Sequence, residues 1–101
     1  MKQHLLIFLT MLAGLTTASS GLAYTGETLA SKARVTMNEA SAIAVKARPG
    51  KITDRELERE KGGTGLRYSF DVRANGITYE VGVDAVTGRV LENDREGKNP
   101  D

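Results

Sequence analysis

The chain has 101 residues, with 14 Lys and Arg against 13 Asp and Glu, one His, and neither Cys nor Trp. This length allows one small domain rather than two. The absence of Cys excludes disulfides, thiol nucleophiles and thiolate metal ligands, and the near-neutral charge gives no basic surface of the kind that binds nucleic acid or an anionic membrane.

The first 23 residues have the parts of a cleavable signal peptide. Lys2 supplies the positive start, Leu5 to Leu15 form an apolar run, and small residues lead up to Ala23. The run has 11 residues, well short of the ~20 that span a bilayer as a helix. We therefore expect cleavage after Ala23, with a cut after Ala18 as the alternative, and a periplasmic or secreted product without stable membrane insertion.

Export would remove the only histidine, His4, so the mature chain would have no imidazole or thiol group. These groups are the usual general bases, nucleophiles and zinc or copper ligands. The mature chain would keep 13 basic and 13 acidic residues, which we take to be interspersed. We predict that the protein is not an enzyme and that it has no catalytic, cofactor-binding or metal-binding residues.

One helix is predicted near the start of the mature chain. Residues 24–35 are small and polar, which indicates a flexible leader or at most an irregular strand. Thr36 and Glu39 have the spacing of a capping box, which starts a helix, and Pro49 ends it. Its narrow apolar face, which suits packing on a sheet, consists of Ala40, Ile43, Ala44 and Ala47.

Residues 66–74 and 77–84 predict a β-hairpin, because apolar and polar side chains alternate along both segments. Asn75-Gly76 between them favours a two-residue type I′ turn. Three aromatic residues fall on the apolar side, and we interpret them as core residues rather than as a stacking surface for a ligand. They are Tyr68, Phe70 and Tyr79.

A second turn is predicted over residues 84–88. We expect Asp84 to accept hydrogen bonds from turn amides and Gly88 to take a positive φ, because a single carboxylate is too few ligands for calcium. Val90 and Leu91 then form a short last strand. The charged residues 93–101 are expected to be a disordered tail.

Residues 52–61 are ambiguous between helix and strand. They are good helix formers, but a helix would bury only Ile52 and Leu57, whereas a strand would extend the sheet. We favour the strand. It would place four carboxylates on one face, those of Asp54, Glu56, Glu58 and Glu60, and basic residues on the other with Leu57.

Two interpretations of this charged strand remain open. It could be an edge that docks a peptide or protein through Arg55, Glu56, Glu58 and Arg59. Its charges could instead serve to discourage aggregation of an edge strand.

Several segments together resemble the PepSY domain. The most specific is Val83-Asp84-Ala85-Val86-Thr87-Gly88-Arg89-Val90-Leu91, and the others are Pro49-Gly50-Lys51-Ile52, Tyr68-Ser69-Phe70-Asp71-Val72 and Tyr79-Glu80-Val81. The resemblance places a PepSY-like domain at residues 36–92, although residues 52–61 are more charged than the family's usual strand. It implies an α+β fold with one helix packed on a small antiparallel sheet of three to four strands, and it brings no catalytic residues.

The resemblance also carries an expected function. Domains of this family resemble part of the propeptides of thermolysin-like metallopeptidases, and secreted copies are thought to inhibit or regulate peptidases. We therefore expect an exported module that binds a protein or peptide, with a peptidase as the first candidate. The alternative is a sensory or accessory subunit of a membrane protein outside the cytoplasm.

Overall fold

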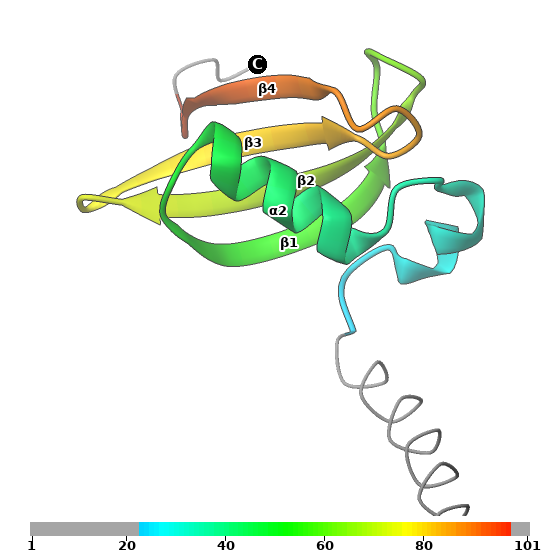
Figure 1. Cartoon of the computed structure of the whole chain (residues 1–101), viewed down its shortest axis with the longest axis horizontal. Helices are drawn as coiled ribbons and strands as arrows, with labels where there is room; N and C mark the ends of the chain where they lie inside the picture. The colour runs from blue at the N-terminus through cyan, green and yellow to red at the C-terminus, as the bar shows by residue number, and fades with distance from the viewer. Residues whose placement is uncertain (1–22, 98–101) are drawn as a thin grey trace, which may run out of the picture.

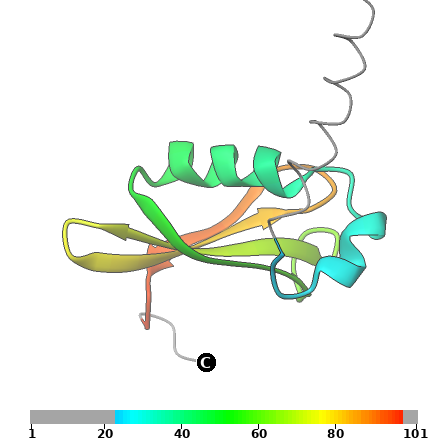
Figure 2. The same ribbon diagram turned by 90° about the horizontal axis from the view of Figure 1, so that it is seen from below.

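The computed structural model of the chain describes residues 23–97, so the predicted signal peptide lies outside the described residues except for Ala23. The elements in chain order are η1 (Glu27–Lys32), α2 (Met37–Ala47), β1 (Lys51–Arg59), β2 (Leu66–Ala74), β3 (Ile77–Asp84) and β4 (Val90–Arg95). The strands form one antiparallel sheet in the order β1-β2-β3-β4. The helix α2 lies across one face of this sheet (Figures 1 and 2). The predicted α+β fold is confirmed.

The helix α2 begins at the predicted capping box. The Thr36 hydroxyl accepts a hydrogen bond from the Glu39 amide at 3.1 Å, and the Glu39 carboxylate accepts one from the Thr36 amide at 2.9 Å. Ala40 and Ala44 are fully buried against the sheet. No helix within residues 23–97 is long and apolar enough to cross a lipid bilayer.

The hairpin of β2 and β3 also follows the prediction. Asn75 and Gly76 have φ values of 52° and 78°, the positive values that a type I′ turn requires at both positions. The two-residue turn pairs Ala74 with Ile77 and Phe70 with Val81. The turn thereby fixes which residues of the two strands share a face.

The core lies between α2 and the sheet. Its largest fully buried side chains include Tyr68, Phe70 and Leu57, which confirms the first two as core residues. The Tyr68 hydroxyl donates a hydrogen bond to the Val35 carbonyl at 2.6 Å. Tyr79 is half-buried, and the Arg48 guanidinium lies 3.9 Å from the centre of its ring.

The ambiguous segment is a strand, β1, with a bulge near its start. Ile52 and Leu57 are an odd number of positions apart, so strict alternation would place them on opposite faces. The register shifts between Ile52 and Asp54, which leaves Thr53 as an extra residue. Ile52 and Leu57 therefore both pack against the core, and the acidic residues of β1 lie on the other face.

The leader lies against the outer edge of β1. Thr25 forms a parallel bridge with Glu56, and the Leu57 amide donates to the Thr25 carbonyl at 2.9 Å. We expected a flexible leader or an irregular strand here, but the structure has the 3₁₀ helix η1. Gly26, which precedes it, has φ 87°, and a β-carbon there would clash with the Leu57 carbonyl. The middle of the β1 edge is therefore already occupied.

The last strand is longer than predicted. β4 extends to Arg95, into the segment that we expected to be a disordered tail. The side-chain Nδ2 of Asn93 donates to the Ala47 carbonyl at 3.2 Å, and its Oδ1 accepts from Arg48 Nε at 3.0 Å. These polar contacts attach β4 to the end of α2 and replace the apolar anchor that the sequence lacks.

Candidate functional site

The sheet face opposite α2 collects most of the acidic residues of the chain. Strand alternation and register put nine carboxylates there, and we call this surface the acidic face. Its members are Asp54, Glu56, Glu58, Glu60, Asp71, Glu80, Glu92, Asp94 and Glu96. No helix of residues 23–97 covers it (Figure 2).

Basic residues are few on this face. Among the strand residues that face it, three are basic, namely Lys51, Arg67 and Arg73. We expected the charges to be interspersed, but the fold gathers most of the acidic residues on one face. Successive residues of a strand lie on opposite faces of the sheet, so charges that alternate along the chain can collect on different faces. A net charge near zero is therefore compatible with a strongly negative surface.

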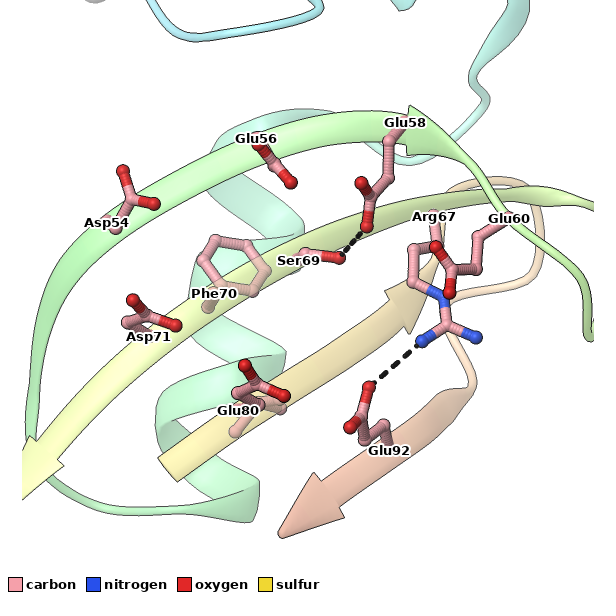
Figure 3. A pocket seen from close by; sticks show the side chains of 11 residues that line it. Asp54, Glu56, Glu58, Glu60, Arg67, Ser69, Phe70, Asp71, Glu80 and Glu92 are labelled. Atoms are coloured by element: carbon pink, nitrogen blue, oxygen red, sulfur yellow. Dashed lines mark hydrogen bonds and ion pairs between the residues drawn. The ribbon is translucent and has the colours of Figure 1, made fainter. Parts of the chain in front are cut away.

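A hollow of about 370 Å³ lies in the middle of the acidic face (Figure 3). Ser69 on β2 lines it, and Gly82 on β3, the register partner of Ser69, lies under the Arg67 side chain. Carboxylates from all four strands surround these two residues. In Figure 3 the side chains of Glu56, Glu80 and Glu92 stand around the hollow.

One row of carboxylates crosses the whole sheet. Asp54 pairs with Asp71, Asp71 with Glu80, and Glu80 with Asp94. Like charges directly opposite each other on neighbouring strands destabilise a sheet. The row therefore lowers the stability of the folded sheet.

The pKa values of the acidic face reflect this crowding. Burial, followed by the charges of Glu96 and Asp54, raises the pKa of Asp71. Burial, followed by neighbours of which Glu92 is the strongest, raises the pKa of Glu80. A hydrogen bond to Glu58, then burial and adjacent carboxylates, raises the pKa of Glu56. The raised pKa values mean that each of these carboxylates gains stability when it binds a proton or when a positive charge lies beside it.

Arg67 lies at one end of the hollow and is only 9 % exposed. Its Nη1 donates to the Glu92 carboxylate at 3.1 Å, and its Nη2 donates to the Lys61 carbonyl at 3.2 Å. Its Nε is buried and has no acceptor among the described residues. Gly82 makes room for it, because a β-carbon there would lie 2.9 Å from Nη1.

Three of the carboxylates also form a tight group. The side-chain oxygens of Asp71, Glu80 and Glu96 lie within 4.8 Å of one another. Calcium takes six to eight oxygen ligands, which is more than three carboxylates supply without further groups. We assign no metal site to this group.

The turn after β3 has the structural role that we predicted. Asp84 is 1 % exposed and accepts hydrogen bonds from the amides of Val86 and Thr87, at 2.9 and 3.0 Å, and from Thr64. These bonds outweigh the effect of burial and lower the Asp84 pKa to about 2. Gly88 has φ 81°.

The residues predicted to bind a partner lie on two sides of β1. Glu56 and Glu58 belong to the acidic face, where Ser69 donates to the Glu58 carboxylate at 2.6 Å. Arg55 and Arg59 alternate with them and lie on the other side of the strand with Leu57. The fold therefore joins the two glutamates to Asp71, Glu80 and Glu92, which we did not predict as site residues.

A comparison with protein families gives a clear match. The family model PepSY, described as "Peptidase propeptide and YPEB domain", matches residues 34–94, well over half of the chain. The matched region begins just before α2 and ends within β4. Neither the curated proteins nor the solved structures contain a significant match.

Proposed function

Since the chain belongs to the PepSY family, we propose that it is an exported, non-enzymatic module that binds and regulates an extracytoplasmic peptidase. The family description, which names peptidase propeptides, supports the choice of partner. The signal-like N-terminus supports export. The only His lies in that N-terminus and the chain has no Cys, which supports a binding role rather than a catalytic one.

The observation that carries the proposal is the uncovered, charged face of the sheet. α2 covers the opposite face, and the leader occupies the middle of the β1 edge. The acidic face is thus the broad surface that the described domain leaves open to a partner. A sheet supported from behind by a packed helix presents its side chains in a fixed arrangement, which lowers the entropic cost of binding.

The test is an inhibition assay with the purified exported chain. Secreted metallopeptidases of the thermolysin type from the same cells would be incubated with increasing amounts of the chain, and hydrolysis of a fluorogenic peptide would be followed. We expect a saturable fall in rate and a complex of defined stoichiometry on a sizing column. Unchanged rates and no complex with any of these peptidases would contradict the proposal.

A further inference from the structure

The acidic face has far more negative charge than the domain itself neutralises. Within residues 23–97 the single salt bridge is that of Arg67 with Glu92. Of the other two basic residues on the face, Arg73 donates to the Thr78 hydroxyl rather than to a carboxylate, and Lys51 forms no salt bridge within the described residues. Most of the nine carboxylates therefore lack a cationic partner in the described domain, and a partner with positive charge would supply one.

Arg67 points to a ligand independently of the carboxylates. A buried guanidinium with an unsatisfied Nε is costly, because each buried polar group normally has a hydrogen-bond partner. Arg67 lines the hollow, so an acceptor bound there that reaches Nε would satisfy this donor. A peptide supplies carbonyl oxygens that can accept from Nε beside its cationic side chains, whereas a bare metal ion supplies no acceptor.

We propose that the acidic face binds a Lys- or Arg-rich segment of the partner protein, with one cationic side chain held in the hollow beside Ser69. This inference rests on the proposed function and names the kind of surface that the partner presents. The hollow of about 370 Å³ exceeds the volume of a single ion and suits the end of a long side chain. Glu56, Glu80 and Glu92 would receive that side chain from different strands.

The rest of the segment would follow the carboxylate row. Neighbouring strands lie about 4.8 Å apart, and alternate residues of an extended peptide lie about 6.8 Å apart. Three Lys at alternate positions therefore span about 13.6 Å along the row, close to the roughly 14.4 Å between β1 and β4, so their ammonium groups can reach carboxylates across the sheet. Such contacts strengthen encounter at low salt and weaken as ions screen them.

The probe is a fluorescein-labelled peptide of alternating Lys and Ala, titrated with the purified exported chain and followed by fluorescence anisotropy at low and physiological salt. The same length of alternating Glu and Ala is the control peptide. The test variant is Asp71→Asn/Glu80→Gln. The matched control is Glu27→Gln/Glu39→Gln, which removes the same charge away from the acidic face and keeps a capping box, since Gln substitutes for Glu there.

We expect saturable binding of the Lys peptide, no binding of the Glu peptide, at least tenfold weaker binding by the test variant, and a change within twofold for the matched control. Thermal melts would establish that both variants are folded. Equal weakening in both variants, or no binding by the wild type, would overturn the inference. The inference would also be overturned if the chain did not bind the Lys peptide but bound calcium, or dimerised, through the acidic face.

The inhibition assay separates this inference from the proposed function. If the test variant inhibits the peptidase as well as the wild type does, the acidic face is not the binding surface, although the regulatory function stands. If the wild type binds the Lys peptide through the acidic face but inhibits no peptidase, the inference holds and the proposed partner is wrong.

Discussion

Neutralising the middle of the carboxylate row should stabilise the domain. The row contains three neighbouring like-charge pairs, Asp54 with Asp71, Asp71 with Glu80, and Glu80 with Asp94. Each such pair costs about 0.2 to 1 kcal/mol. Asp71→Asn/Glu80→Gln removes the repulsion in all three, so we expect the free energy of unfolding to rise by about 1 to 2 kcal/mol.

The assay is thermal unfolding at low salt, where the melting temperature should rise by about 4 to 8 °C per kcal/mol for a domain of this size. The pH dependence gives a second readout. Because the folded-state pKa values of Asp71 and Glu80 are raised, the folded wild type binds protons more readily than the unfolded chain. Its stability should therefore increase as the pH falls through these pKa values, and the variant should gain less.

Glu27→Gln/Glu39→Gln is the control, because it changes net charge without touching the row. A melting temperature that is unchanged or lower in Asp71→Asn/Glu80→Gln, or raised equally in the control, would refute the reasoning. A rise in stability together with a loss of peptide binding would instead indicate that the carboxylates are kept for binding at a cost in stability.

Three further predictions concern the turns and export. Gly76→Val should lower the free energy of unfolding by more than about 1 kcal/mol, because Val tolerates the φ of 78° poorly. No neighbouring atom would crowd the new side chain, so the loss would come from the backbone alone. An unchanged thermal melt would contradict this. Asp84→Asn should cost about 1 to 3 kcal/mol at neutral pH. Because the Asp84 pKa is lowered to about 2, its contribution is present above the unfolded pKa and is lost as the pH falls through about 2, so melts of wild type and variant should converge in acid. Equal stability at neutral pH would contradict the role of Asp84. Mass spectrometry of the exported product should give a chain that begins at Tyr24, and a product retaining Met1 would refute signal cleavage.

The sequence predicts the fold well because its local signals agree with one another. Thr36 and Glu39 fix the start of α2, and Asn75-Gly76 fixes the β2–β3 register. The bulge in β1 could not be assigned from propensity, although Ile52 and Leu57 can share the core only with an extra residue between them. The extension of β4 was missed because Asn93 is held by polar contacts with α2.

The candidate site could be predicted only in part. Glu56 and Glu58 were found because they are neighbours along one strand. Asp71 and Glu80 were missed as site residues, yet a two-residue turn at Asn75-Gly76 already places them opposite each other. The contribution of β4, including Glu92, depends on a register shift between Gly82 and Val83, and no sequence signal that we used indicates it.

Mapping the bound Lys peptide by NMR tests the central claim most directly. In a titration of the ¹⁵N-labelled exported chain, we predict the largest amide shifts in the middle of the sheet, at Glu56–Glu58, Ser69–Asp71 and Glu80–Gly82, with α2 nearly unchanged. Shifts concentrated in α2, or at the outer edge of β1 near Arg59, would contradict the assignment of the acidic face as the binding surface.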